Sequence, residues 1–179
     1  KEFASQVKGS LFVERNIPLK GITYSVSEEA DFYIDGIRPD ASGSYFDLHT
    51  PDGVYRNQFF NQLGMHNLSN ALVALAMASK AGLLVEDLAK SLASFPGVER
   101  RLQVLINEKN RVLIDDYAHH PTEIKAVYET LKLSFPADEK CVVFQPHLFS
   151  RTQDFMTDFA TALSLFDRVL LLDIYPARE

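Results

Sequence analysis

The alternation of strand-like and helix-like segments in residues 98–179 is the feature that most limits the fold of this chain. Apolar runs of strand length occupy residues 102–106, 111–115, 140–144 and 168–174, and helical spacing of apolar side chains occupies 121–134 and 152–166. The order strand, helix, strand, helix, strand predicts an α/β fold with a parallel, doubly wound sheet and right-handed crossovers. Ligands of such sheets bind at the carboxyl ends of the strands, and polar clusters follow the strands here.

Residues 1–95 have a different pattern. Apolar and polar side chains alternate over 30–37, 45–49 and 54–60, and Asp52-Gly53 between the last two segments is a strong hairpin signal. We therefore expect a small antiparallel sheet in the first 62 residues or so. Two helices are expected to follow, over 63–82 and 85–95, and Gly82 is suited to end the first of them.

Charge and hydropathy argue against some classes of function. The net charge of −6 disfavours nucleic-acid binding through a basic face. No apolar run approaches the roughly 20 residues of a membrane helix, so no membrane span is expected. The single cysteine, Cys141, cannot form an internal disulfide and is interpreted as a small core residue on a buried strand, which fits a reducing, cytoplasmic compartment.

Two polar groups in the middle of the chain suggest nucleotide contacts, each with a simpler alternative. Asn67 and Asn70 are three residues apart on one helical face, where carboxamides match the N6/N7 edge of adenine; helix capping by Asn67 is the alternative. Arg100 and Arg101 suit a phosphate, because guanidinium groups bind its oxygens bidentately; surface charge paired with Glu99 is the alternative.

The segment Asp115–His120 places two aspartates and two histidines in one strand-to-helix loop. Three interpretations stay open: a metal site with His147 as an outside ligand, Asp116 as an acceptor for ribose hydroxyls, or an aspartate that caps the helix beginning near Pro121. The adjacent histidines argue against the metal site, because successive side chains in an extended loop usually diverge.

The segment Gln145–Thr152 follows the next strand. His147 and Arg151 could clamp a carboxylate, and Arg151 lies near a predicted helix N-terminus, where anions are favoured; taken alone, each is equally an ordinary polar loop residue. The value of this segment is its place, because the loops around Tyr117 and His147 are expected at the same edge of the sheet.

Together these motifs resemble those of the Mur ligase family. They occur in family order over residues 64–179: Gly-x-His-Asn-x-x-Asn, Pro-Gly-Val-x-Arg-Arg, Asp-Asp-Tyr-Ala-His-His-Pro-Thr-Glu, Phe-Gln-Pro-His, Ser-Arg-Thr and Leu-Asp-Ile-Tyr-Pro-Ala-Arg-Glu. The resemblance is most specific toward the members that join L-alanine to UDP-N-acetylmuramate, using ATP and Mg²⁺ and an acyl-phosphate intermediate. It implies that Asn67 and Asn70 contact adenine, that Arg101 contacts ATP and that Asp116 contacts the ribose.

The same resemblance assigns the remaining polar residues to the other substrates. It implies that Tyr117, His119, His147 and Arg151 face the sugar nucleotide and the incoming alanine, whose carboxylate Arg151 and His119 would hold. Leu148 stands where several family members carry an arginine, so a salt bridge from that position to substrate is open to question.

The resemblance also implies two partial domains: residues 1–100 from a central ATP-binding domain, and residues 101–179 from a Rossmann-like ligase domain. No Gly-x-x-x-x-Gly-Lys-[Ser/Thr] phosphate loop occurs in the 179 residues, so the main phosphate and metal ligands are expected outside this chain, which is expected to be inactive alone. The alternatives are a sister ligase that recycles cell-wall tripeptide, a non-enzymatic nucleotide-binding α/β module, and a metal-dependent hydrolase. The hydrolase would use Asp115, Asp116, His119, His120 and His147.

Overall fold

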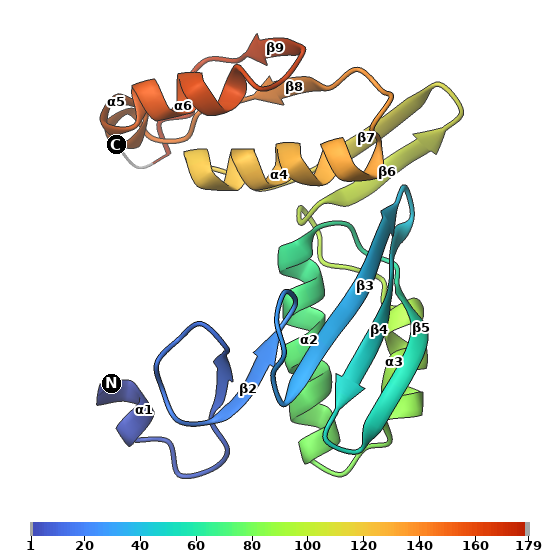
Figure 1. Ribbon diagram of the computed structural model, residues 1–179. Helices are drawn as coiled ribbons and strands as arrows, with labels where there is room; N and C mark the ends of the chain where they lie inside the picture. The colour runs from blue at the N-terminus through green and yellow to red at the C-terminus, as the bar shows by residue number, and fades with distance from the viewer. Residues whose placement is uncertain (1, 178–179) are drawn as a thin grey trace. The chain divides into compact units, whose positions relative to one another are not determined.

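The computed structural model describes residues 2–177, apart from the side chain of Phe3, as two compact units. The first unit ends at Gly97 and the second begins at Val98. Each unit contains strands and helices of its own, which confirms the mixed α/β fold class (Figure 1).

The first unit holds a five-stranded sheet whose strands follow the order of the chain. The short helix α1 (Glu2–Ser5) precedes β1 (Phe12–Glu14), β2 (Ile22–Ser25), β3 (Phe32–Asp40), β4 (Gly43–Thr50) and β5 (Gly53–Phe60). The antiparallel β3–β4–β5 part and its hairpin at Gly53 confirm the prediction. The sheet extends beyond this predicted antiparallel part, because β1 pairs with β2 and β2 with β3 in parallel. With three and four residues, β1 and β2 are too short to reveal themselves by alternation.

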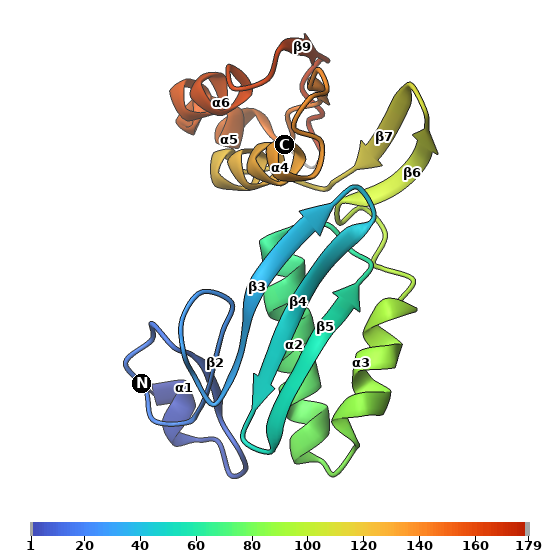
Figure 2. The same ribbon diagram turned by 45° about the vertical axis from the view of Figure 1, so that its right-hand side comes forward.

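Two helices complete the first unit. Helix α2 (Met65–Lys80) runs along one face of the sheet, and α3 (Val85–Ala93) follows it (Figures 1 and 2). Leu68, Leu72 and Leu75 are buried against the inward side chains of β3 and β4, as their helical spacing predicts. Gly82 has a φ of +96°, and the N–H of Leu83 bonds the carbonyl of Ala78 at 3.2 Å. This glycine-ended hydrogen-bond pattern confirms the predicted end of the helix.

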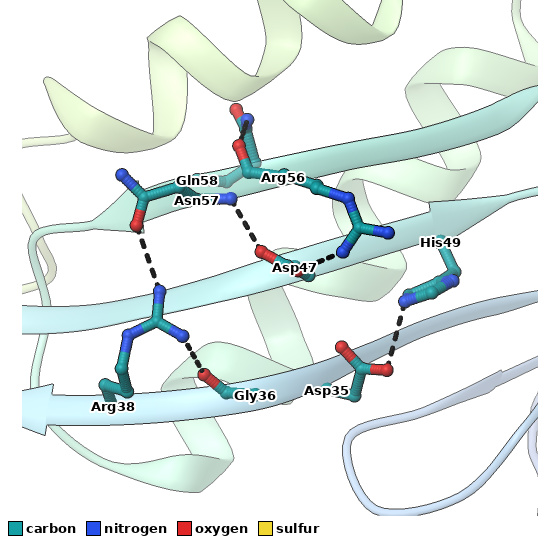
Figure 3. A network of polar contacts seen from close by, with 8 residues as sticks. All are labelled: Asp35, Gly36, Arg38, Asp47, His49, Arg56, Asn57 and Gln58. Carbon is teal, nitrogen blue, oxygen red and sulfur yellow. Dashed lines mark hydrogen bonds and ion pairs between the residues drawn. The ribbon is translucent and has the colours of Figure 1, made fainter.

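The opposite face of this sheet carries a polar network at two irregularities in strand register (Figure 3). Gly36 in β3 and Asn57 in β5 have φ values of +57° and +53°. Arg38 donates to the Gly36 carbonyl at 2.8 Å and to Asn57 Oδ1 at 2.9 Å. Asp47 on β4, between these two strands, accepts the Asn57 N–H at 2.7 Å and a hydrogen bond from Arg56 Nη1 at 2.9 Å. These bonds satisfy polar groups that the bulged strands leave unpaired in the ladder.

The second unit begins with a hairpin and continues with two further strands and three helices. Its elements are β6 (Gln103–Glu108), β7 (Arg111–Asp115), α4 (Pro121–Ser134), β8 (Cys141–Phe144), α5 (Phe149–Asp154), α6 (Met156–Leu163) and β9 (Arg168–Leu171). The bounds of α4 and β7 are those predicted, and β8 pairs with β9 in parallel as expected. The predicted hairpin is present, but β6 extends to Glu108, two residues beyond the predicted end of this strand. The described residues give β7 no pairing with β8, so the parallel sheet consists of β8 and β9, and β7 pairs antiparallel with β6.

Three predictions for this unit need correction. The single helix expected over 152–166 is α5 and α6, separated at Phe155, whose φ of −111° and ψ of 19° are not helical. The hydrogen bonds from Phe155 to Arg151 and from Phe159 to Phe155 keep the two helices contiguous. Cys141 is exposed rather than buried, and all four residues of β9 are exposed. For Cys141 the reason is that α4 and α6 pack on the side chains of Val142 and Phe144, whereas alternate side chains of β8 point to the uncovered face. No residue of β9 belongs to the buried cluster that these helices form with β8.

The described helices of both units are too short or too polar for a bilayer span: none of them, within residues 2–177, has the length and hydropathy to cross a membrane.

Candidate functional site

The loop between β7 and α4 is held in place by the carboxylate of Asp116. Its Oδ2 accepts the backbone N–H of Leu102 at 2.8 Å, and its Oδ1 accepts the N–H of Ala118 at 2.7 Å. Leu102 and Asp116 are both held in place, because Leu102 is 1% exposed and the side chain of Asp116 is half-buried. Asp116 therefore joins the segment before β6 to the loop after β7, which is a contact that the sequence analysis did not anticipate.

Tyr117 and His119 project from this loop beside Arg100. The guanidinium carbon of Arg100 lies 4.5 Å from the centre of the Tyr117 ring, and Tyr117 donates its backbone N–H to the Arg100 carbonyl at 2.8 Å. The rings of Tyr117 and His119 meet edge to face, with centroids 5.3 Å apart. Arg100 Nε also lies 3.6 Å from Asp115 Oδ2. The predicted pairing of this arginine segment with Glu99 is therefore wrong for Arg100, whose ion-pair partner is Asp115.

Helix α4 begins with a reciprocal cap made by His120 and Glu123. His120 Nδ1 accepts the N–H of Thr122 at 3.4 Å, while Glu123 Oε2 accepts the N–H groups of His119 and His120 at 2.8 and 3.1 Å. This is the capping-box arrangement, with Pro121 as the first helical residue. An aspartate cap was one expectation for this helix, and it is wrong because His120 occupies the capping position.

The cap perturbs the acidity of Glu123. Partial burial acts to raise the pKa of this carboxyl, but the N–H bonds from His119 and His120 and the nearby charges of His119 and Arg101 outweigh burial and lower the pKa. Glu123 Oε2 also lies 3.4 Å from His119 Nδ1, which in turn lies 3.0 Å from the Tyr117 carbonyl. The orientation of the His119 ring is thus set by two oxygens, so His119 has a defined direction in the loop.

The loop after β8 lies at the same end of the second unit as the N-terminus of α4 (Figure 1). The rings of His120 and Phe155 meet edge to face with centroids 4.8 Å apart, which ties the first loop to the junction of α5 and α6. His147 forms a parallel bridge with Tyr175 beyond the ends of β8 and β9, and their rings lie 5.4 Å apart. The two loops singled out in the sequence are thus brought to one end of one unit, although β7 does not share a sheet with β8.

Leu148 and Arg151 follow His147 in a short, tightly turned segment. Leu148 has a φ of +73°, a left-handed conformation that is uncommon for a leucine, and its N–H bonds the Tyr175 carbonyl at 2.9 Å. Such a conformation is sustained only where the surroundings impose it, and these positions are frequent at binding sites. Arg151 is the third residue of α5, partly buried, and within residues 2–177 no carboxylate lies at ion-pair distance from its guanidinium.

The candidate nucleotide residues are distributed over both units. Asn67, the third residue of α2, donates Nδ2 to the Leu63 carbonyl at 2.8 Å, and its Oδ1 accepts no hydrogen bond from residues 2–177. It does not cap α2 in the expected way, because the capping position is Gly64 and no side-chain cap bond is formed there. Asn70 is exposed on the same helix, and Arg101 is exposed in the second unit.

Metal binding finds no support in the part of the chain that the structure describes. No three side chains of His, Cys, Asp and Glu within residues 2–177 are grouped so that they could hold a metal ion. Asp116 and His120 have hydrogen-bond partners in the backbone and in Thr122 instead. The metal-dependent hydrolase considered from the sequence therefore has no geometric basis in the described residues.

Three residues of this region were missed from the sequence. They are Arg100 as a partner of Tyr117, Glu123 as part of the cap, and Tyr175 beside His147. The spacing of His120 and Glu123 matches a capping box and could have identified the cap. The other two contacts join residues 17 and 28 positions apart, for which local patterns carry no signal. The final residues of the Ile-Tyr-Pro-Ala-Arg-Glu motif, Arg178 and Glu179, lie outside the described residues.

Comparisons with known proteins agree with this division of the chain. The family model of the Mur ligase middle domain matches residues 9–78, and that of the Mur ligase glutamate ligase domain matches residues 100–179. The UDP-N-acetylmuramate–L-alanine ligases of Flavobacterium psychrophilum and Christiangramia forsetii are 51% and 49% identical over 181 residues, which cover 100% of this chain and 40% of each relative.

A solved structure extends the likeness to three dimensions. The crystal structure of UDP-N-acetylmuramate-alanine ligase from Thermotoga maritima superposes with a TM-score of 0.74 and 27% identity, over 87% of this chain and 35% of that one. This chain thus spans about 40% of the length of the curated relatives that it matches. With matches to two successive domains of one family and a corresponding fold, the chain belongs to the Mur ligase family.

Proposed function

We propose that this chain is part of an ATP-dependent ligase that joins L-alanine to UDP-N-acetylmuramate, a step in peptidoglycan precursor synthesis. The observation that carries the proposal is the contact of His120 with Phe155, which brings the loop after β7 to the segment 147–155 at one end of the second unit. The loop and this segment bear Tyr117, His119, His147 and Arg151, a set of side chains suited to anionic and carboxylate-bearing substrates. Relatives that are about half identical over the whole chain carry the name of this activity.

Within this proposal, residues 1–100 belong to a central ATP-binding domain and residues 101–179 to the ligase domain. Asn67 and Asn70 would contact adenine and Arg101 the phosphates, because one carboxamide oxygen and two exposed side chains are available for such contacts. Asp116 would meet the ribose only with its remaining lone pairs, since both carboxylate oxygens already accept backbone N–H bonds.

The residues of the second unit would orient the reaction. ATP, as a substrate, supplies the phosphoryl group that activates the muramoyl carboxylate; the amine of L-alanine then attacks that carbonyl, and phosphate and the amine proton leave. Arg151 and His119 would bind the alanine carboxylate and so direct the amine toward the carbonyl carbon. Such orientation accounts for a large share of the rate in bimolecular transfers.

Magnesium would have to be held elsewhere in the complete protein. No metal-binding group occurs among the described residues, so no step is assigned to a metal here. We also propose that the isolated chain does not ligate, because its 179 residues contain no phosphate-loop motif. Release of phosphate from ATP by the isolated chain, dependent on both other substrates, would contradict this part of the proposal.

The proposal is tested with the complete protein purified and supplied with ATP, UDP-N-acetylmuramate and L-alanine. The expected result is formation of ADP, phosphate and the alanyl sugar nucleotide, with none of them formed when any one substrate is left out. Replacing L-alanine by the tripeptide L-Ala-γ-D-Glu-meso-diaminopimelate separates the two ligase activities. Turnover with the tripeptide but not with L-alanine would assign the recycling activity. Nucleotide binding without turnover under any of these conditions would assign a binding module.

A further inference from the structure

Tyr117 lies in the candidate site with a ring that has little support from the core. It is 48% exposed, and its ring contacts among the described residues are Arg100 on one face and His119 at the edge. An exposed tyrosine without packing partners samples several rotamers, and ordering it costs conformational entropy. The direction of the Tyr117 hydroxyl therefore depends on its two neighbours.

Arg100 is held on both sides of this contact. Its backbone has a φ of +57°, its N–H donates to Gln103 Oε1 at 3.0 Å, and its carbonyl accepts the Tyr117 N–H at 2.8 Å. Its guanidinium lies over the Tyr117 ring at 4.5 Å and 3.6 Å from the Asp115 carboxylate. The Asp115 carboxylate and the ring of Tyr117 thus hold one planar cation between them.

From this geometry we propose that Arg100 is a positioning residue for Tyr117. Of the two adjacent arginines, Arg101 would contact the nucleotide and Arg100 the aromatic ring. The inference rests on the proposed function for its kinetic consequence. A planar guanidinium covers the face of a tyrosine ring, which a lysine ammonium does not do to the same extent. Through Tyr117, Arg100 also supports His119, whose ring meets Tyr117 and whose Nδ1 lies 3.0 Å from the Tyr117 carbonyl.

A double-mutant cycle in the complete protein provides the kinetic test, with Arg100→Lys, Arg100→Ala, Tyr117→Ala and the combined Arg100→Ala/Tyr117→Ala variants. Arg100→Ala is expected to lower kcat/KM for UDP-N-acetylmuramate and L-alanine about two- to five-fold, the effect of losing one exposed cation–π contact. The KM for ATP is expected to stay unchanged, and Arg100→Lys is expected to fall between Arg100→Ala and the native enzyme. In the Tyr117→Ala background, Arg100→Ala is expected to have no further effect.

The matched control is Arg111→Ala. Arg111 lies in the β6–β7 hairpin that follows Arg100, its side chain is 64% exposed against 58% for Arg100, and it has an ion pair to Glu108 at 3.1 Å. Its replacement is expected to leave the kinetics unchanged. An equal loss from Arg100→Ala in the native and Tyr117→Ala backgrounds would overturn the inference, because Arg100 would then act independently of the ring. A raised KM for ATP would also overturn it, because it would place Arg100 at the nucleotide.

A spectroscopic measurement makes the inference independent of the reaction. With 3-fluorotyrosine incorporated in the complete protein, the ¹⁹F resonance that Tyr117→Phe removes belongs to this ring. Arg100→Ala is expected to shift that resonance, and Arg111→Ala to leave it in place. If the complete protein is an active ligase and Arg100→Ala leaves this resonance in place, the role of Arg100 is rejected and the proposed function is kept. A shifted resonance in a protein without ligase activity would keep the contact and reject the proposed function.

Discussion

The carboxylate of Asp116 accepts the backbone N–H of Leu102 at 2.8 Å and thereby connects two segments 14 residues apart. Its second oxygen accepts the N–H of Ala118 at 2.7 Å, so neither oxygen can be replaced by a donor without loss. One residue thus fixes the loop that carries Tyr117 and His119 to the segment that carries Arg101.

Asp116→Asn is expected to destabilise the second unit by about 1–3 kcal/mol, because the new amide NH₂ faces an N–H donor and leaves a polar group unpaired. Urea denaturation of the native and variant chains measures the difference. Asp138→Asn serves as the control, since Asp138 is exposed and its carboxylate forms no hydrogen bond or ion pair within residues 2–177. That control is expected to change the free energy of unfolding by less than about 0.5 kcal/mol.

A pair of glycines in the first unit separates the cost of backbone conformation from that of a steric clash. Gly43 and Gly53 begin neighbouring strands with φ values of +154° and +156°. A Cβ on Gly43 would lie 2.1 Å from the Phe60 carbonyl oxygen, whereas a Cβ on Gly53 would have nothing within 4 Å. Gly53→Ala is therefore expected to cost about 1 kcal/mol and Gly43→Ala about 2–4 kcal/mol. Equal losses in thermal or urea denaturation would show that the close approach at Gly43 is wrong.

Local chemistry explains which elements of the fold could be predicted. Helix α4 begins at Pro121 and ends at Ser134 as expected, because a proline at the first position and regular apolar spacing act within the segment itself. The β4–β5 hairpin was found for the same reason, through Asp52-Gly53. The parallel pairing of β1 with β2 has no such local signature, and neither does the exposure of β9, which depends on what packs against it.

The candidate site likewise has features that could be predicted from the sequence and features that could not. The polar clusters after β7 and β8 were found from their place after predicted strands, since that position is general to α/β sheets. What each side chain does within them was not predictable. Asp116 bonds Leu102, and Arg100 covers Tyr117, because the chain returns to the same place after the β6–β7 hairpin. Contacts of that kind depend on tertiary geometry, and the local periodicity of a single sequence does not predict them.

The pH dependence of stability should reveal the cap of α4. Because the pKa of Glu123 is lowered in the folded state, its carboxylate contributes stability that is fully present above its ordinary pKa of 4.5 and is lost as the pH falls through the lowered folded value. Glu123→Gln keeps an acceptor oxygen but removes the charge. The native chain is therefore expected to be more stable than this variant at pH 7, with the difference disappearing as the pH falls below 4.5 and through the lowered pKa of the folded state.

Glu129→Gln provides the control for that series. Glu129 is exposed on the same helix and has no ion pair in the described residues, so its replacement is expected to give the same small difference at every pH. Urea denaturation at several pH values measures both variants. A native-to-Glu123→Gln difference that grows as the pH falls would reverse the expected sign and contradict the role of the carboxylate in the cap.

Arg151 offers a specific test of how the incoming amino acid is bound. Its guanidinium has no ion-pair partner within residues 2–177, and it follows the left-handed turn at Leu148. In the proposed function it would bind the carboxylate of L-alanine. In the complete protein, Arg151→Ala is expected to raise the KM for L-alanine by about ten-fold or more, and Arg151→Lys by less, because lysine keeps the charge but loses the bidentate geometry. The KM for ATP should stay within about two-fold, since only the interaction with L-alanine is removed.

Arg168→Ala is the control, because Arg168, on β9, forms an exposed ion pair with Glu139 at 3.8 Å. Steady-state kinetics with each substrate varied in turn measures these constants, and an equal rise in all three KM values would indicate a disturbed fold rather than a lost carboxylate contact.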